Sequence, residues 1–260
     1  MKPLPARLAA RCRFRAELHV PLLAGRTRIG WLRPELAARL AAWPNVFQTS
    51  AEVVRLLDSD ALDRVVEQLA QEGFIPGWRN ERYRIAGLFD IERAAARPFG
   101  LATRAVHVNA TTGESMWLAR RSDSKPTDPG MLDNLVGGGI GATLSVEETL
   151  VKEAWEEAGI PAELARRAIP GGTVELLREV PEGVQSELIH VYELALPRDF
   201  RPANQDGEVA EFGLLPLAEV RRLIDETEEL TVDAALVALD YFNRRNARPG
   251  SASASADRAT

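Results

Sequence analysis

The sequence predicts an α+β protein with two folded units and a tail. Its 260 residues exceed one typical domain but fall short of three. A content of 45% hydrophobic and 27% charged residues is globular and excludes collagen-like or wholly disordered chains. Strand-like and helix-like segments alternate from Val106 to Asp240. We expect a small N-terminal α/β domain over residues 1–104, a second domain over 105–246 and a disordered tail over 247–260.

The composition argues against several classes of protein. No stretch approaches about eighteen uninterrupted apolar residues, so we expect no membrane partner. The single cysteine, Cys12, favours a reducing compartment and argues against a cysteine-built zinc site. A net charge of -6 and a pI near 5.3 disfavour broad nucleic-acid binding, which needs a basic surface. The arginine-rich residues 1–15 could be interpreted as an organelle-targeting peptide. No apolar region or cleavage pattern follows them, however, so we predict a cytoplasmic protein.

In the N-terminal domain we expect two helices and a short strand. The first helix has Pro34 in its first turn and ends before Pro44. The second runs over residues 59–72, where the apolar residues form one stripe and Gly73 is a plausible C-terminal cap. Residues 83–86 could form the strand. Nothing in this domain carries recognisable chemistry.

The second domain begins with a predicted hairpin. Residues 106–110 and 116–119 alternate like strands, and a turn-forming segment separates them. A further strand is expected over 188–194. A final helix over 232–245 has a buried stripe of Ala235, Leu236, Leu239 and Phe242.

The segment from Leu135 to Pro161 carries the chemistry. Ser145 with Glu148 three residues later forms a capping box, which predicts a helix start. Gly159 followed by Ile160 and Pro161 predicts its end. Between these limits, one side of the helix is acidic and another is a packing side. The acidic side consists of Glu153, Glu156 and Glu157.

Three carboxylates on one helix side call for a cation. Each like-charged pair at this spacing destabilises an isolated helix by roughly 0.2–0.5 kcal/mol. Magnesium prefers oxygen ligands and is usually held by a few carboxylates together with substrate phosphates. The glycines of residues 137–139 would let the backbone approach a ligand and could offer a carbonyl to the metal. The alternative is a solvated acidic helix face beside a glycine loop.

This segment resembles a Nudix box. The family pattern has an opening glycine, a glutamate, an arginine–glutamate pair before an aliphatic residue, two paired glutamates, and a closing glycine and aliphatic residue. The matching residues are Gly138, Glu153, Ala154, Glu156, Glu157, Gly159 and Ile160. Two positions depart from the pattern. Lys152 replaces the arginine, which keeps the positive charge but loses the two parallel hydrogen bonds that a guanidinium group can donate to a carboxylate. Leu144 replaces the first glutamate.

The flanking residues resemble one branch of Nudix hydrolases, related to the domain fused to fungal thiamine pyrophosphokinase. The resembling segments are residues 120–122, Lys125, 129–130, 132–136 and 204–209. In that branch an N-terminal domain of uncharacterised role precedes the Nudix domain, and a hydrophobic residue at the position of Leu144 is usual. The resemblance implies a mixed sheet sandwiched between helices. It also implies hydrolysis of a diphosphate, with thiamine diphosphate and its oxidised analogues as the expected substrates.

The resemblance also suggests roles for individual residues. Glu153, Glu157 and the distal acid Glu208 are the candidates for catalysis. Mg²⁺, with Mn²⁺ as the alternative, would be held by Glu153, Glu156, Glu157 and the carbonyl of Gly137. The candidates for substrate binding are Arg120, Arg121, Lys125 and Trp117. Cationic side chains suit phosphate oxygens, although a solvated basic loop is the alternative for the first three. The tryptophan could stack on a heterocycle, although a core position is more common.

Three functions remain open from the sequence. The first is a metal-dependent pyrophosphohydrolase acting on thiamine diphosphate or its analogues. The second is a Nudix hydrolase of nucleoside diphosphate derivatives, such as dinucleotides or nucleotide sugars. The third is a Nudix-fold sensor that binds a ligand without turnover, as the departures at Leu144 and Lys152 suggest. For His107 and His190 we favour hydrogen-bonded structural roles. We expect a small-molecule diphosphate as partner, and either a monomer or a homodimer.

Overall fold

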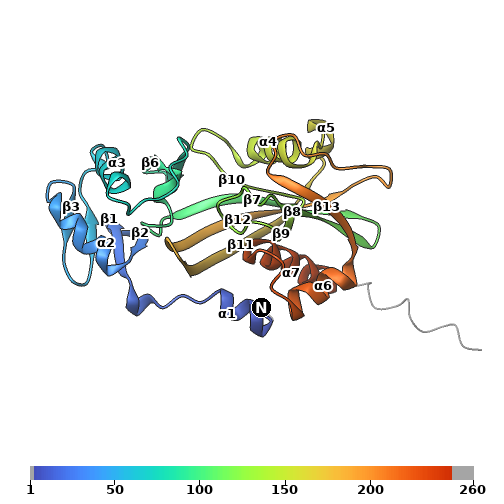
Figure 1. Cartoon of the computed structure of the whole chain (residues 1–260), viewed down its shortest axis with the longest axis horizontal. Helices are drawn as coiled ribbons and strands as arrows, with labels where there is room; N and C mark the ends of the chain where they lie inside the picture. Colours follow the sequence, from blue (N-terminus) through green and yellow to red (C-terminus); the bar gives the residue numbers. More distant parts are fainter. Residues whose placement is uncertain (1–2, 248–260) are drawn as a thin grey trace, which may run out of the picture.

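The computed structural model describes residues 3–247. It forms a mixed α+β fold in which a small N-terminal unit lies beside a larger helix–sheet–helix sandwich (Figure 1). This confirms the predicted fold class. The predicted tail over 247–260 lies, apart from its first residue, outside the described residues.

The N-terminal unit has a four-stranded sheet, a two-stranded sheet and short helices. The order of the larger sheet is β2-β1-β4-β3, and β5 pairs with β6. The helices between residues 34 and 71 pack against the larger sheet around one apolar core. The elements are α1 (Ala6–Arg11), η1 (Ala16–Leu18), β1 (Val20–Ala24), β2 (Thr27–Leu32), α2 (Pro34–Arg39), η2 (Leu40–Ala42), β3 (Phe47–Thr49), β4 (Val54–Leu56), α3 (Leu62–Gln71), β5 (Arg82–Ile85), β6 (Phe89–Glu92) and η3 (Arg93–Ala95).

The larger unit is built on a seven-stranded sheet. Its main path runs β11-β12-β7-β8-β13, with β12 parallel to β7 and the other neighbours antiparallel. Its elements are β7 (Ala102–Thr112), β8 (Ser115–Arg121), β9 (Leu132–Asn134), β10 (Val136–Gly139), α4 (Val146–Ala158), α5 (Ala162–Ala165), β11 (Ile169–Val180), β12 (Gly183–Ala195), β13 (Val209–Pro216), α6 (Leu217–Glu226) and α7 (Val232–Ala247).

The strands β7 and β8 separate beyond their turn. They pair directly only at Thr111–Met116 and Thr112–Ser115. Further on, β10 pairs with β7 and β9 pairs with β8, so the β9–β10 segment fills the opening. This arrangement brings the glycines of β10 into the sheet, where α4 packs beside them.

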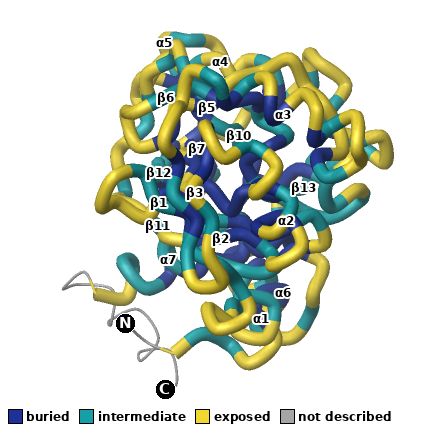
Figure 2. The backbone as a smooth tube through the Cα atoms, turned by 90° about the vertical axis from the view of Figure 1, so that its left-hand side faces the viewer, coloured by how far each residue is buried: buried dark blue, intermediate teal, exposed yellow. Residues whose placement is uncertain are grey.

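Helices cover both faces of the large sheet. Helix α4 packs on one face over a core that includes Val106, Val108 and Leu150. Helices α6 and α7 cover the other face (Figure 1). Helix α1 joins this second layer, because Leu8 belongs to the same core as α6 and α7. The buried backbone runs through the interior, and exposed segments surround it (Figure 2).

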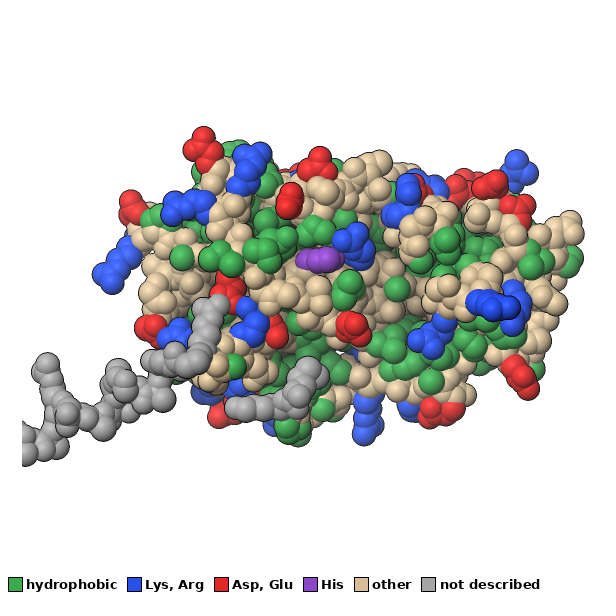
Figure 3. Space-filling model, turned by 180° about the vertical axis from the view of Figure 1, so that it is seen from behind, with side chains coloured by type: hydrophobic (Ala, Val, Ile, Leu, Met, Phe, Trp, Pro, Cys, Tyr) green, Lys and Arg blue, Asp and Glu red, His purple; other side chains and the backbone are tan. Residues whose placement is uncertain are grey.

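The surface carries both signs of charge. Lysine and arginine alternate with aspartate and glutamate over the face shown in Figure 3. Within residues 3–247, no helix is long and apolar enough to cross a membrane.

Local patterns predicted the helices better than the strands. The capping box at Ser145 and the left-handed Gly159 bound α4 as predicted. The helices predicted from Pro34, over 59–72 and over 232–245 are confirmed as α2 with η2, α3 and α7. The hairpin and the strands at 83–86 and 188–194 are also confirmed. The sequence analysis did not identify β1–β4, β11, β13 or α6.

Backbone hydrogen bonds connect the two units. The Ala142 N–H, in the loop before α4, donates to the Arg82 carbonyl of β5 at 2.8 Å. The Val184 N–H of β12 donates to the Arg97 carbonyl at 2.9 Å. The first bond ties the β5–β6 hairpin to the segment before α4, and the second ties the segment after β6 to β12.

Candidate active site

A cavity of about 1010 Å³ lies between the two units. Its walls include Glu153 and Glu156 of α4, the three glycines of β10, and the loop residues Arg121 and Lys125. The N-terminal unit contributes Tyr83 and Arg93. This volume is at the upper end of the range of small-molecule sites.

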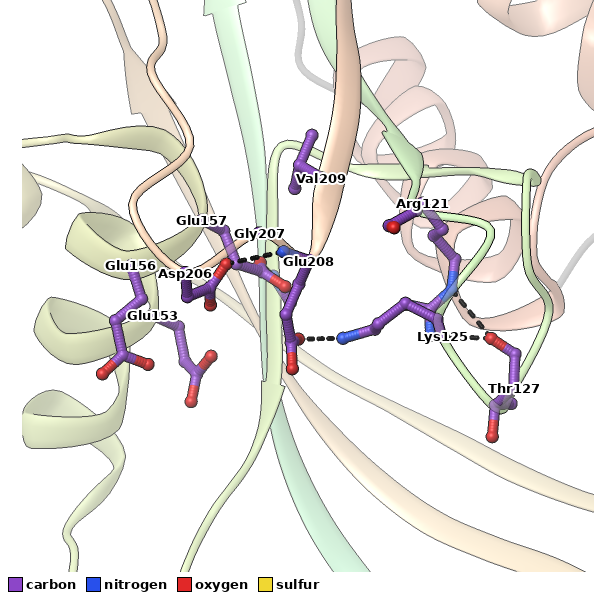
Figure 4. Close-up of polar contacts among 12 residues, drawn as sticks. Arg121, Lys125, Thr127, Glu153, Glu156, Glu157, Asp206, Gly207, Glu208 and Val209 are labelled. Atoms are coloured by element: carbon purple, nitrogen blue, oxygen red, sulfur yellow. Dashed lines mark hydrogen bonds and ion pairs between the residues drawn. The ribbon is translucent and has the colours of Figure 1, made fainter.

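The acidic side of helix α4 faces this region, and local contacts fix both ends of the helix. The Ser145 side chain accepts from the Glu148 N–H, and the Glu148 carboxylate accepts from the Ser145 N–H. Gly159 ends the helix in the left-handed conformation, which suits glycine. Figure 4 shows Glu153, Glu156 and Glu157 on the helix face that points to the loop carrying Glu208.

Glu157 is the most buried of these acids, with 6% of its surface exposed. Its carboxylate accepts a hydrogen bond from the Gly137 N–H at 2.7 Å. Burial, reinforced by the negative charge of Glu153, raises the pKa of Glu157 to about 8. The Gly137 N–H thus connects β10 directly to the box helix, while the metal-binding role of the Gly137 carbonyl stays a prediction.

Glu153 and Glu156 share a cation within the helix. The Lys152 ammonium lies 3.1 Å from a Glu153 carboxylate oxygen and 2.5 Å from one of Glu156. Burial raises the pKa of Glu153 despite the opposing effect of Lys152. Lys152 therefore neutralises part of the negative charge of the acidic side, which was the reason for expecting a metal ion there.

Each glycine of β10 makes room for a different side chain. A Cβ added to Gly137 would lie 2.8 Å from the imidazole ring of His107. One added to Gly138 would overlap the Glu153 carboxyl group, and one added to Gly139 would overlap the Tyr83 hydroxyl. The glycine run is therefore required by close approach on both sides of the strand.

The loop wall opposite α4 carries paired charges. Lys125 forms an ion pair with Glu208 (Figure 4). Burial lowers the pKa of the Lys125 ammonium, and the nearby Arg121 and Arg93 cations act in the same direction. Arg121 donates to the Asp133 carboxylate at 2.9 Å and to the Thr127 carbonyl. Lys125 and Glu208 thus lie in the cavity as a pair.

Two predicted substrate-binding residues are not in this cavity. Arg120 donates to the Gly130 carbonyl and pairs with Glu211, whereas its neighbour Arg121 lines the cavity. Adjacent strand residues point to opposite faces, which explains the difference. Trp117 is buried in the core beneath α4, and its indole N–H donates to the Thr112 hydroxyl at 3.1 Å. This cavity therefore gives no support to the predicted substrate-binding role of these two residues, which stays a prediction.

The two strand histidines have hydrogen-bond partners. His107 is buried, and its Nδ1 lies 2.8 Å from the Asn134 side-chain oxygen. Arg104 donates to His190 Nε2 at 3.3 Å. Both contacts agree with the structural roles expected, although His107 also lines the cavity.

Several cavity residues were not predicted from the sequence. Tyr83 and Arg93 belong to the domain in which the sequence indicated no chemistry. Glu187 of β12 also lines the cavity and accepts from the Thr103 hydroxyl at 2.9 Å. Burial and the negative charge of Asp233 raise the pKa of Glu187. These residues are far apart in the sequence and form no motif, so the sequence could not show that they share a cavity. Only the strand that carries Tyr83 was predicted, over residues 83–86.

The carboxylate oxygens are suitable ligands for a hard divalent cation, but the side chains are not arranged around a common point that could hold one. Within residues 3–247, no group of three or more His, Cys, Asp or Glu residues is placed to hold a metal ion. In favour of a cation, the Glu153 carboxyl group lies directly against the backbone of Gly138. Glu153 is also close enough to Glu157 for its negative charge to help raise the pKa of Glu157. Carboxylate oxygens are the ligands that magnesium prefers.

Two family models match this chain. The model described as "NUDIX domain" matches residues 98–236. The model described as "Domain of unknown function (DUF4743)" matches residues 6–103. The second match covers the unit that contributes Tyr83 and Arg93.

Three curated proteins are similar in sequence. "Nudix hydrolase 24, chloroplastic" of Arabidopsis thaliana is 41% identical over 194 residues, covering 71% of this chain and 53% of that protein. "Nudix hydrolase 20, chloroplastic" of the same plant is 40% identical over 194 residues, covering 71% and 52%. An uncharacterised protein of Saccharomyces cerevisiae is 30% identical over 216 residues, covering 72% and 63%. The chain therefore spans about half the length of its plant relatives.

Proposed function

Since this chain belongs to the Nudix family, we propose that it hydrolyses a diphosphate-containing small molecule with the help of a divalent metal ion. One observation carries the proposal: Glu153 and Glu156 of α4 and the cations Lys125 and Arg121 line the same cavity. Such a cavity offers carboxylates for a metal ion and cationic groups for phosphate oxygens. Two relatives that carry the name Nudix hydrolase support the proposal.

We assign the metal ion, Mg²⁺ or alternatively Mn²⁺, to the α4 acids and to β10. Glu153, Glu156 and Glu157 would hold it together with the carbonyl of Gly137. When bound, a divalent ion neutralises charge on phosphate oxygens and lowers the pKa of a water molecule. The Lys152 ammonium keeps Glu153 and Glu156 close together without the metal.

The protein groups divide the remaining tasks. A carboxylate of Glu153, Glu157 or Glu208 takes a proton from the attacking water. Lys125 and Arg121 donate to phosphate oxygens, and Glu208 holds the Lys125 ammonium inside the cavity before substrate arrives. The position of Glu157 beneath β10 shields its carboxylate from bulk solvent.

For the substrate, we propose thiamine diphosphate or its oxidised analogues, cleaved to the monophosphate and phosphate. The support is the resemblance of the segments around Lys125 and Glu208 to the thiamine-related branch. A nucleoside diphosphate derivative is the alternative substrate class, because the same metal and phosphate groups would serve it. A sensor without turnover is the third possibility, favoured by Leu144, Lys152 and the absence of a gathered metal site within residues 3–247.

A substrate panel tests these proposals. Phosphate release would be measured with Mg²⁺ or Mn²⁺ for thiamine diphosphate, oxythiamine diphosphate, ADP and ADP-ribose, followed by product identification in isotopically labelled water. We expect turnover that is highest with a thiamine compound and is abolished in Glu157→Gln. Glu163→Gln, on the exposed surface of α5, is the matched control. Binding without release would identify a sensor, and preference for ADP-ribose would overturn the thiamine proposal.

A further inference from the structure

Tyr83 is a buried residue whose hydroxyl has no hydrogen-bond partner among the described residues and remains accessible from the cavity. Its side chain belongs to the apolar core of the N-terminal unit and is 7% exposed. None of the hydrogen bonds formed within residues 3–247 involves the hydroxyl, although the residue lines the cavity. The hydroxyl oxygen is not among the fully enclosed polar atoms without a partner in the described residues, so it keeps access to the cavity and can donate to a ligand or water there.

Arg93 adds a cation over the ring of the same tyrosine. Its guanidinium lies 5.4 Å from the centre of the Tyr83 ring, and one nitrogen donates to Glu81 at 2.6 Å. The residue lines the cavity, and its charge acts on both Glu153 and Lys125. Arg93 is therefore a positive charge that the N-terminal unit delivers to the box helix and the loop wall.

Two contacts fix this pair relative to the box. The Tyr83 hydroxyl lies against Gly139, where a Cβ would overlap it. The neighbouring Arg82 carbonyl accepts the Ala142 N–H at 2.8 Å. Gly139 and Ala142 both belong to the segment that leads from β10 to α4. The hydroxyl is thus held directly beside the segment that leads into the box helix.

We infer that Tyr83 and Arg93 bind a phosphate group of the substrate, so that the N-terminal unit completes the active site. The inference rests on the proposed function for the diphosphate, and it adds two binding residues from a domain of unknown function. A hydroxyl donor next to a guanidinium suits a phosphoryl oxygen, and the guanidinium adds charge-assisted hydrogen bonds. The close contact with Gly139 then serves to admit the hydroxyl to the cavity.

The main experiment measures binding of a non-hydrolysable probe to the full chain. Methylene diphosphonate would be titrated calorimetrically with Mg²⁺ present. Tyr83→Phe keeps the ring, so we expect unchanged melting temperature and about tenfold weaker binding. Arg93→Gln should weaken binding by about tenfold or more. Tyr241→Phe, in α7 outside the cavity, is the control and should bind like the wild type.

A second variant tests the same contact from the larger unit. Gly139→Ala should displace the Tyr83 hydroxyl, and its loss of binding should not add to that of Tyr83→Phe. Gly141→Ala is the matched control, because its Cβ would meet only ordinary contacts at 3.9 Å. Additive losses, or wild-type binding by Tyr83→Phe and Arg93→Gln, would overturn the inference.

The outcomes also separate this inference from the proposed function. Hydrolysis that is lost in Glu157→Gln but unaffected in Tyr83→Phe would leave the enzyme without a role for the N-terminal unit. Probe binding that Tyr83→Phe weakens, without turnover of any diphosphate, would support the binding role and contradict the hydrolase. Failure of the wild type to bind the probe would overturn the inference.

Discussion

The two walls of the cavity are constructed in different ways. The helical wall consists of Glu153 and Glu156, with Glu157 buried behind them against β10. All three come from one helix, whose spacing places them on one side regardless of the rest of the fold. Tyr83 and Arg93 come from a hairpin in the other unit, and main-chain contacts such as Ala142–Arg82 bring them to the cavity. The first wall therefore depends on local sequence, whereas the second depends on how two domains dock.

The largest expected effect comes from the helical wall. Glu153→Gln removes a carboxylate charge next to Gly138 and Lys152 while retaining side-chain volume. Because this acid is a proposed metal ligand or base, we expect kcat/KM for the best diphosphate substrate to fall about 10³-fold. Steady-state phosphate release at saturating Mg²⁺ measures the change.

The matched control for this variant is Glu147→Gln. Glu147 lies on the exposed part of the same helix and outside the cavity. It should retain the wild-type rate. Similar losses in the two variants would mean that the helix needs its overall negative charge and that the acidic side has no separate role.

A smaller effect is expected where the backbone touches the helical wall. Gly138→Ala would place a Cβ inside the Glu153 carboxyl group, so the carboxylate must shift. Misplacing a reacting group by about 1 Å can lower activity about 10²-fold, and we expect a loss approaching that size. Gly213→Ala is the control, since its Cβ would meet nothing within 4 Å. If Gly138→Ala remained fully active, the Glu153 carboxylate would have to be free to move.

The same contrast explains what the sequence predicted. Ser145, Gly159 and the acids between them have fixed spacing, so the box helix and its ends could be assigned without a structure. Arg120 and Arg121 were indistinguishable, because the strand register that sends one inward is set by pairing with β9 and β13. Strands such as β11 and β13 were missed, since their burial depends on neighbours far away in the chain.

The helical wall should also make metal-free stability depend on pH. Burial and Glu153 raise the pKa of Glu157 from 4.5 to about 8 in the folded state. Its stabilising contribution is therefore complete below the unfolded value and is lost as pH rises through about 8. Glu157→Gln lacks this titration, so its free energy of unfolding relative to that of the wild type should rise between pH 5 and pH 8.5.

Urea unfolding of both proteins in EDTA measures this difference. The midpoints would be compared at the two pH values, with Glu163→Gln as the variant that should follow the wild type. Parallel pH dependence in wild type and Glu157→Gln would mean that the buried carboxyl is not a source of strain. In that case the acids of α4 would not lower the stability of the folded protein more than the residues that the N-terminal unit contributes.

The smallest effect is expected at Lys152, where this chain departs from the family pattern. Its side chain is 45% exposed, and it bridges Glu153 and Glu156. Lys152→Arg should change stability by less than about 1 kcal/mol, because partly exposed ion pairs contribute little. The arginine fork could hold the two carboxylates more rigidly, so we expect kcat to change by less than about twofold, within roughly 0.4 kcal/mol. A tenfold gain in kcat would show instead that the helical wall is limited by the orientation of its acids, which the lysine leaves loose.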